Sequence, residues 1–588
     1  MNNVFDKILE STGFYKDLYR TVTGGYTPVS VTGVSAVHKS HIVKCLAKER
    51  KVLMLCADES AAVKSAQDIN TLAGEDIACV FPEKEYVFTV VEGASGEYEH
   101  KRIEALSRIL DGRCRVVCAS AAAAAQATVP ADVLKRYSFS VSQGDEVQIK
   151  ELGEKLLACG YSRCDMVEGQ AQFSVRGSVI DIFPVSERIP YRIELWGDEV
   201  DSVSLFDIES QRRTDFADEV RISPALEVIF ESKEIFSQRL ESLFKSARGK
   251  NIDNIRTHIM RERELVESGI TLSNLDKYYM LAYEKPAFIF DYFTDGLCAV
   301  CEYTAMNDNM RTYVSQLSLD IKAMYESGAM FRRLEGFYLD TPELDARISS
   351  LPSVFLDTFM RQNGDFRFKR LINTDCRQSA SWGGSMIALG EELDNYIEQD
   401  YTVILLAGSE KTLPIIISDL AADGYDAESL DGLADPELYP KRIYVKTGSL
   451  SGGFDYPDAK CALITQAKAM SAKRKKPKHK AGEEIRTLSD LKFGDLVVHS
   501  MHGIGRFAGI RSLETGGVKK DYITINYAGT DVLYVPVTQL DLVSRYVGAA
   551  DDSNVKLHKL GSAEWQKTRT RVKRAVRDIC LLYTSPSP

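Results

Sequence analysis

The segment Phe493–Tyr546 reads FGDLVVHSMHGIGRFAGIRSLETGGVKKDYITINYAGTDVLYVPVTQLDLVSRY. Its four β-rich runs are separated by glycine, asparagine or charged turn residues. The runs are 496–499, 506–513, 521–527 and 532–537. In the third run Ile523 and Ile525 alternate with polar neighbours, as a strand with one buried face requires. The segment therefore predicts a small, self-closing β-domain.

The length and composition of the chain predict several domains. A chain of 588 residues with 44% hydrophobic content can bury several cores, and the length alone suggests about four domains. The net charge of −11 argues against a protein that coats nucleic acid, so any contact with DNA must use a local basic patch. Lys473–Lys480 is such a patch, read either as a solvated linker or as a contact with DNA or with a protein that works on DNA.

Cysteine usage and hydropathy predict a cytoplasmic protein with no membrane partner. The twelve cysteines are scattered, mostly within apolar runs, as reduced core thiols are. The lone CxxC, Cys298 to Cys301, has no second pair nearby, so we read it as strand core and expect no metal site. No apolar run reaches the roughly 18 residues of a membrane span, and the N-terminus lacks the pattern of a signal peptide.

The N-terminal region alternates short apolar strands with amphipathic helices, which predicts an α/β domain with a mostly parallel sheet. After its first strand comes a phosphate-loop-like motif that begins at Gly33 and ends with His38, Lys39 and Ser40. His38 stands where the motif needs its second glycine, whose missing Cβ lets the backbone approach a phosphate. We find no acidic strand end downstream to hold Mg²⁺, and we expect a degenerate loop without a nucleotide.

The C-terminal segment contains two motifs that are specific enough to suggest a protein family. HGIGRF and LYVPV, with their flanks, resemble the RNA-polymerase-interacting module of bacterial transcription-repair coupling factors, which is shared with CarD-type regulators. The resemblance implies a Tudor/SH3-like β-barrel that adds an edge strand to the RNA polymerase β subunit. It also implies that exposed apolar residues carry the contact, and Ile510 and Leu513 match those positions, although Leu513 also suits barrel core. An anonymous SH3-like barrel is the alternative interpretation.

A second block, FSVRGSVIDIFPVSERIPYRIELWGDEVDSVSLFDIESQRR, alternates in β fashion. It resembles the UvrA-binding domain shared by UvrB and the coupling factors. The resemblance implies UvrA as a partner, with Arg176 and Phe183 as contacts and Arg163 as a weaker match because it is displaced by one residue. A solvated strand-end arginine and a core aromatic are the alternatives for Arg176 and Phe183.

These observations predict a multidomain α/β and β protein. A degenerate RecA-like domain carries the β-rich insertion, and a further α/β domain, a basic linker, the β-domain and a terminal helix follow. The expected ranges are 1–136 and 224–350 for the first α/β domain, 137–223 for the insertion, 351–467, 468–488, 489–548 and 549–588. The last eight residues, 581–588, do not continue that helix because they contain two prolines.

For function, the resemblance implies an adaptor that binds stalled RNA polymerase and recruits UvrA in transcription-coupled nucleotide excision repair. The family's ATP-dependent DNA translocase, with its ATP, Mg²⁺ and most of its DNA contacts, has no matching motifs in these 588 residues, and we expect no catalytic residues and no cofactor. One alternative is a nucleotide-dependent helicase or UvrB-like subunit that uses Lys39 and Ser40. Another is a CarD-like regulator with an unrelated N-terminal half.

Overall fold

The computed structural model describes most of the chain, and the statements below concern the residues it describes. The side chains of 512–521, 536 and 545 also lie outside the description. The residues outside it altogether are 1–3, 87–95, 209, 247–251, 268–271, 273–274, 331–333, 362, 380–381, 383–385, 434–435, 466–493, 500–501, 516–517, 530, 537–542, 547–556, 558 and 560–588.

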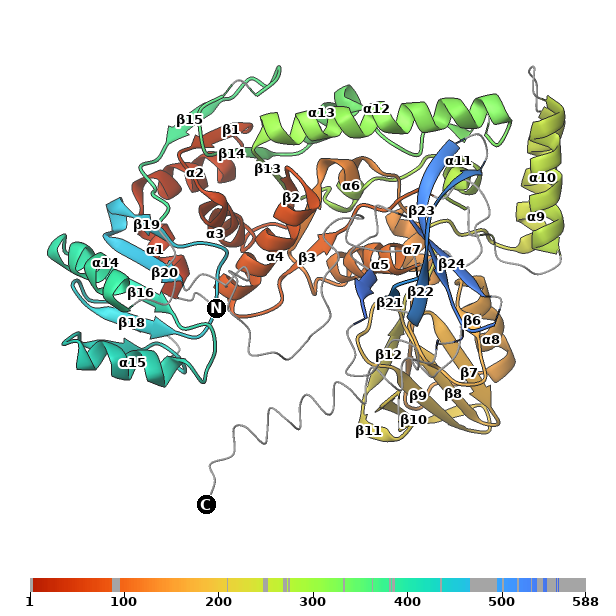
Figure 1. The fold of residues 1–588 in the computed structure, drawn as a ribbon, viewed down its shortest axis with the longest axis horizontal. Helices are drawn as coiled ribbons and strands as arrows, with labels where there is room; N and C mark the ends of the chain where they lie inside the picture. The colour runs from red at the N-terminus through yellow and green to blue at the C-terminus, as the bar shows by residue number, and fades with distance from the viewer. Residues whose placement is uncertain are drawn as a thin grey trace.

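A seven-stranded parallel sheet forms the centre of the first α/β unit (Figure 1). Its order is β15-β1-β14-β13-β2-β4-β3. Its strands are β1 (Val29–Thr32), β2 (Val52–Cys56), β3 (Ala78–Phe81), β4 (Val116–Ser120), β13 (Leu297–Cys301), β14 (Ser353–Asp357) and β15 (Arg370–Asn373). Alternate residues of β2 enter two different cores, Leu53 and Leu55 on one side, Val52 and Met54 on the other. The sheet is therefore packed on both faces, which explains its near-continuous apolar strands.

Helices surround this sheet and come from both halves of the unit. α4 shows how they begin and end: Asp58 caps its N-terminus by accepting from the amide of Ala61, and Gly74 ends it with a positive φ. The helical elements are α1 (Val4–Ser11), α2 (Gly13–Thr23), α3 (Ala36–Leu46), α4 (Glu59–Ala73), α5 (Glu97–Leu110), α6 (Ala121–Ala125), α7 (Ala131–Tyr137), α9 (Lys233–Ser246), α10 (Ile252–Glu267), η1 (Leu275–Tyr278), α11 (Tyr279–Ala282), η2 (Ile289–Tyr292), α12 (Tyr303–Ser327) and α13 (Thr341–Ser350).

The domain boundary expected at residue 350 is wrong. β14 and β15 lie beyond it in the sequence, yet both pair with β1, and β14 also pairs with β13. They belong to the first sheet because their backbone groups pair with those of β1 and β13. The first unit therefore extends at least to Asn373.

A β-rich block is inserted between β4 and β13, as expected. It contains a six-stranded sheet of order β11-β10-β9-β8-β7-β6 and a separate pair of β12 with β5. Its elements are β5 (Phe139–Ser142), α8 (Ile149–Ala158), β6 (Ser162–Arg163), β7 (Gln172–Arg176), β8 (Val179–Phe183), β9 (Tyr191–Trp196), β10 (Glu199–Phe206), β11 (Arg213–Phe216) and β12 (Glu219–Ile222). α8 covers one face of the sheet, where Leu152 and Leu156 join the core that contains Phe173 and Ile180. We call residues 139–222 the inserted block.

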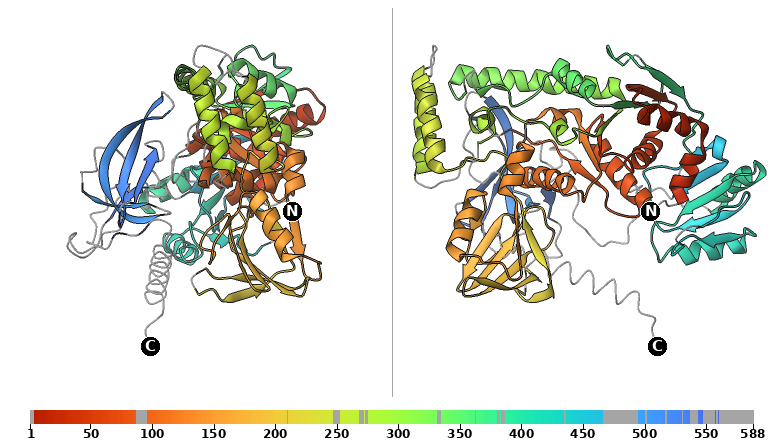
Figure 2. Two further views of the ribbon diagram at one scale, coloured as in Figure 1. Left: turned by 90° about the vertical axis from the view of Figure 1, so that its right-hand side faces the viewer. Right: turned by 180° about the vertical axis from the view of Figure 1, so that it is seen from behind.

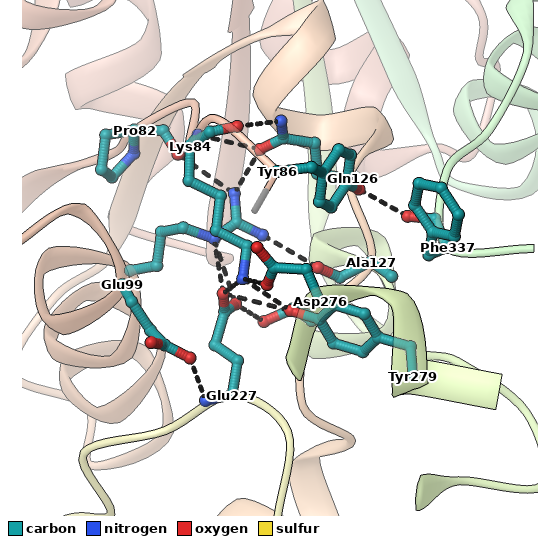
Figure 3. A network of polar contacts seen from close by, with 12 residues as sticks. Pro82, Lys84, Tyr86, Glu99, Gln126, Ala127, Glu227, Asp276, Tyr279 and Phe337 are labelled. Carbon is teal, nitrogen blue, oxygen red and sulfur yellow. Dashed lines mark hydrogen bonds and ion pairs between the residues drawn. The ribbon is translucent and has the colours of Figure 1, made fainter. Parts of the chain in front are cut away.

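A buried ion network joins the chain just after the inserted block to the first unit (Figure 3). The carboxylate of Glu227 accepts from Arg102 Nε at 3.0 Å and lies 2.7 Å from Lys84 Nζ. It also accepts from Thr128 at 2.5 Å and from the Tyr279 hydroxyl at 3.2 Å. The side chains of Glu227 and Arg102 are fully buried, so each charge is compensated by protein groups alone.

A second α/β unit follows the first. Its five-stranded sheet has the order β17-β18-β16-β20-β19, in which only β19 is antiparallel. Its elements are α14 (Met386–Glu398), β16 (Thr402–Leu406), α15 (Leu413–Ala422), β17 (Ala427–Ser429), β18 (Ile443–Lys446), β19 (Phe454–Tyr456), η4 (Pro457–Ala459) and β20 (Cys461–Thr465). Phe454 and Tyr456 pack in the same core as Ile42 of α3, so the two units share an apolar interface.

The C-terminal β-domain stands to one side of the α/β units in Figure 2. Its strands are β21 (Leu496–His499), β22 (Gly503–Thr515), β23 (Val518–Asn526), β24 (Val532–Pro536) and β25 (Val543–Arg545), in the order β24-β23-β22-β21-β25. Ile523 and Ile525 are fully buried, as the alternation predicted. Within the described residues the two outer strands do not pair with each other, so the barrel closure stays a prediction. The basic linker and the terminal helix lie outside the described residues.

The described cysteines and helices can be compared with what the composition predicted. Cys298 and Cys301 are buried in β13, as predicted, and the described cysteines are free thiols. Among the described helices, none combines the length and the apolar character needed to cross a membrane.

Candidate functional site

The solvent side of the six-stranded sheet in the inserted block carries the first candidate surface. Arg176 of β7 pairs with Val179 of β8, which pairs with Glu194 of β9. Residues directly opposite each other share a face, and so do residues two apart on one strand. Arg176, Glu194 and Trp196 therefore lie on the same face, opposite to the one that α8 covers. We call it the outer face.

A carboxylate shared by two arginines lies on the outer face. Arg192 donates to Asp181 through Nε at 2.6 Å and through Nη2 at 2.9 Å, and Arg176 also donates to Asp181. The Asp181 side chain is fully buried beneath them, and its hydrogen bonds raise the pKa of Arg192. Bidentate arginine–carboxylate pairs of this kind have fixed geometry. The cluster carries one net positive charge and leaves the Arg176 side chain 47% exposed.

Two large aromatic side chains flank this cluster and are open to solvent. Trp196, at the end of β9, is 85% exposed, and Phe216 on the edge strand β11 is 65% exposed. The register links Phe216 to Ser204 and Ser204 to Arg192, so Phe216 also lies on the outer face. Arg213 lies over the Phe216 ring at 4.8 Å and pairs with Glu194 at 2.5 Å. Exposed aromatics beside a preorganised arginine are typical anchors of protein–protein interfaces.

Of the three residues predicted from the sequence as contacts, only Arg176 lies on the outer face with an exposed side chain. Arg176 lies on the outer face and is held by Asp181, so it is not a loosely solvated strand end. Phe183 is buried with Val167 and Phe206 in a small cluster of its own. Arg163 is exposed on the edge strand β6, but it pairs with the inward-facing Phe173, which puts it off the outer face. The sequence reasoning missed Arg192 and Trp196.

The second candidate surface is the hairpin of β22 and β23. β21 pairs with β22 over Gly503–Arg506, and next to this pairing the Phe507 amide donates to the Asp495 carbonyl while the Gly494 amide donates to the Phe507 carbonyl. Among the described strands, only β23 pairs with β22 from Ile510 to Thr515. Because no described strand pairs with its other edge, this segment is a candidate for strand addition. Ile510 lies on this segment and is 44% exposed, whereas the Leu513 side chain lies outside the described residues.

The degenerate phosphate loop forms the third candidate, and its groups are turned inward. His38 closes a capping box with Ser35 at the start of α3, and its ring meets Phe454 and Tyr456 edge-on, with 5.0 Å between centroids in each case. Burial lowers the pKa of His38 to about 4. Gly33 has a φ of +87°, and a Cβ there would lie 2.3 Å from the Thr374 carbonyl oxygen.

The remaining loop residues are also engaged by protein groups. Lys39 pairs with Glu302 and donates to Thr358 at 3.2 Å, and the Ser40 hydroxyl donates to the Ala36 carbonyl at 3.3 Å. Because Lys39 already has an anionic partner and His38 is buried, these residues do not fit the phosphates of a nucleotide. The structure corrects one expectation: an acidic strand end exists.

That acid is Asp357, the last residue of β14, directly opposite Thr32 at the end of β1. It accepts from Asn363 Nδ2 at 2.7 Å and from the Tyr303 amide at 3.3 Å, and burial raises its pKa. Sequence reasoning missed it because parallel neighbours in a sheet can be hundreds of residues apart in the chain. The short apolar run before Asp357 was the available signal.

Comparison with known proteins assigns two of these regions to families. Residues 139–227 match the UvrB interaction domain, and residues 491–547 match the CarD-like/TRCF RID domain. The first match contains the outer face, and the second contains the β22–β23 hairpin.

Whole-chain relatives agree with these matches. A transcription-repair-coupling factor of Bacillus subtilis is 30% identical over 98% of this chain and 50% of its own length. Those of Staphylococcus haemolyticus and Staphylococcus aureus strain MRSA252 are 27% and 26% identical, over 94% and 98% of this chain and 48% and 50% of their own lengths. The chain spans about half the length of the curated relatives it matches.

Proposed function

We propose that this chain, homologous along nearly its whole length to half of a transcription-repair coupling factor, acts as an adaptor in transcription-coupled nucleotide excision repair. It contacts stalled RNA polymerase through the β-domain and UvrA through the inserted block. The observation that carries the proposal is that each matched module presents its own open surface. The barrel closure of the β-domain and a cytoplasmic location are part of the same proposal.

For RNA polymerase, we propose that residues 510–515 of β22 add to a strand of the β subunit. The edge of this segment that no described strand pairs with supports the proposal, because strand addition uses main-chain hydrogen bonds for affinity and neighbouring side chains for specificity. Ile510 supplies an apolar contact beside that edge, and Leu513 is proposed as a second one. The full-length relatives' activity on DNA and ATP is not assigned to any residue of this chain.

For UvrA, we propose that Arg176, held by Asp181, is the central polar contact and that Trp196 is the apolar anchor. Arg192 acts as a positioning residue because it occupies the other side of the same carboxylate. Phe183 lies two residues from Asp181 on the same face and supports it by packing in its small buried cluster, and Arg163 is at most a peripheral contact. The partner surface on UvrA should present acidic and apolar groups.

A pull-down of the whole chain against the polymerase β lobe and, separately, against UvrA tests both contacts. Ile510→Arg should abolish capture of the β lobe and leave UvrA binding intact, while Arg176→Glu should do the reverse. Val532→Arg, at a 37% exposed position on the opposite edge of the β-domain, and Arg136→Glu, on the exposed face of α7, are the matched controls. Retention of both partners by Ile510→Arg and Arg176→Glu would refute the two-surface adaptor.

A further inference from the structure

Two thiols face each other at the edge of the first sheet. Cys79 lies on the edge strand β3, and Cys114 lies just before β4. Their Sγ atoms are 3.0 Å apart. A disulfide bond is about 2.05 Å long, so the two sulfurs need to approach by only about 1 Å to bond. Cys79 is partly exposed, whereas Cys114 is buried.

The surroundings of Cys114 hold its sulfur toward Cys79. The Cys114 Sγ lies 3.2 Å from the Ile77 carbonyl oxygen and 2.9 Å from that of Val116, and its amide donates to the Arg108 carbonyl at 3.0 Å. The hydrogen bond between the two sulfurs lowers the pKa of Cys114 and raises that of Cys79, whose burial raises it further, so Cys114 is the thiolate of the pair. Cys298 is a useful contrast because it is buried in β13, where burial alone raises its pKa.

We propose that Cys79 and Cys114 are a reversible redox modification site, in which a hydroperoxide converts the two thiols into an intramolecular disulfide. The Cys114 thiolate attacks one peroxide oxygen, the O–O bond breaks, and the leaving hydroxide takes up a proton to become water, so Cys114 becomes a sulfenic acid. The Cys79 sulfur then loses its proton and attacks the Cys114 sulfur, the S–O bond breaks, and a second water leaves. In total two thiols lose two electrons and two protons, and one peroxide becomes two waters.

The position of the pair gives the disulfide a mechanical consequence. The chain next to Cys79 carries Asp76, which pairs with Arg188 of the inserted block at 3.3 Å. The chain next to Cys114 carries Arg113, which pairs with Glu187 of the same block at 3.0 Å. A bond between the two cysteines joins both contact segments covalently. Oxidation therefore stiffens the base on which the inserted block rests.

The test uses the whole chain, treated with a graded series of hydrogen peroxide and then alkylated and digested without reduction. Mass spectrometry should find a Cys79–Cys114 peptide pair in most molecules, and dithiothreitol should remove it. The oxidised protein should melt several degrees higher than the reduced protein, because a cross-link restricts the unfolded chain. Cys298 should stay a thiol at the same doses.

Two variants separate the pairing from general oxidation. In Cys79→Ser, Cys114 should accumulate as a sulfenic acid that dimedone traps, because the thiol that would form the disulfide is gone. In Cys114→Ala, Cys79 should remain reduced at the same dose, because burial raises its pKa. Over-oxidation of Cys114 to sulfinic acid in the unmodified sequence without the cross-link, or pairing of Cys114 with another cysteine, would overturn the proposal. Neither readout involves UvrA or RNA polymerase, so the result is independent of the adaptor proposal.

Discussion

Two arginine–carboxylate clusters, one within the inserted block around Asp181 and one just after it around Glu227, use the same chemistry for different purposes. Around Glu227, Arg102 and Lys84 are buried and satisfied on all sides by protein groups. Around Asp181, Arg192 is largely covered but Arg176 is half exposed. The comparison teaches that an internal network fixes the position of the block, whereas a cluster with one open arginine beside exposed aromatics offers a surface to a partner.

The largest effect should come from the buried cluster. Glu227→Gln leaves the buried Arg102 without its carboxylate, although Lys84 keeps Asp276 at 2.7 Å, and breaking a buried pair costs about 3–5 kcal/mol of unfolding free energy. Chemical denaturation followed by circular dichroism measures the loss. Glu219→Gln is the control, because that exposed carboxylate pairs with Arg221 at 2.6 Å and should change stability by only about 0.5 kcal/mol. Equal losses in the two variants would contradict the claim that the buried Glu227 network contributes more to stability than an exposed ion pair does.

A change beside the Asp181 cluster should alter UvrA affinity and leave the unfolding free energy nearly unchanged. Trp196→Ala should weaken UvrA affinity by about 30-fold, equivalent to about 2 kcal/mol, because it removes a proposed interface anchor. Its unfolding free energy should stay close to that of the unmodified sequence, since the ring packs against little of the protein. Leu157→Ala, at a 53% exposed position on α8, is the matched control. Isothermal titration calorimetry measures the affinity for UvrA. Unchanged affinity in Trp196→Ala would show that Trp196 is not an anchor of this interface.

A smaller effect on stability should come from the phosphate loop, where His38 is also buried. Burial lowers the pKa of His38 to about 4, below the 6.5 of an exposed histidine. The unfolded chain therefore binds more protons in this window, so the stability from neutral His38 is full above pH 6.5 and is lost as the pH falls toward 4. Relative to His38→Asn, the unmodified protein should lose about 1–2 kcal/mol between pH 6.5 and pH 5. Parallel pH profiles of the two proteins would speak against this burial.

The last prediction concerns nucleotide binding, for which we expect no effect. ATP with Mg²⁺ should not change the melting temperature, because Lys39 is paired with Glu302 and His38 is packed against Phe454 and Tyr456. A nucleotide present at a hundred times its dissociation constant would stabilise the protein by about 2.7 kcal/mol, which differential scanning fluorimetry detects easily. Such a shift, lost in Lys39→Ala, would revive the nucleotide-dependent alternative.

Several features of the site were accessible from the sequence, and others were not. The strands of both matched modules follow from local alternation and turns, whereas the exposure of Ile510 was implied by the resemblance. Trp196 could have been found, since Arg192, Glu194 and Trp196 alternate with the apolar Ile193 and Leu195 along β9. The sharing of Asp181 by two arginines could not, because it depends on the register of three strands.

The sequence by itself determined the local elements, the two modules and the departure at His38, because side-chain alternation and turn chemistry act over a few residues. Only the tertiary structure decided that β14 and β15 complete the first sheet, that Lys39 meets Glu302 and that Cys79 meets Cys114. These contacts join residues that are 35 to more than 300 positions apart. Parallel pairing and the burial of charges depend on how whole elements pack, and no short stretch of sequence encodes that.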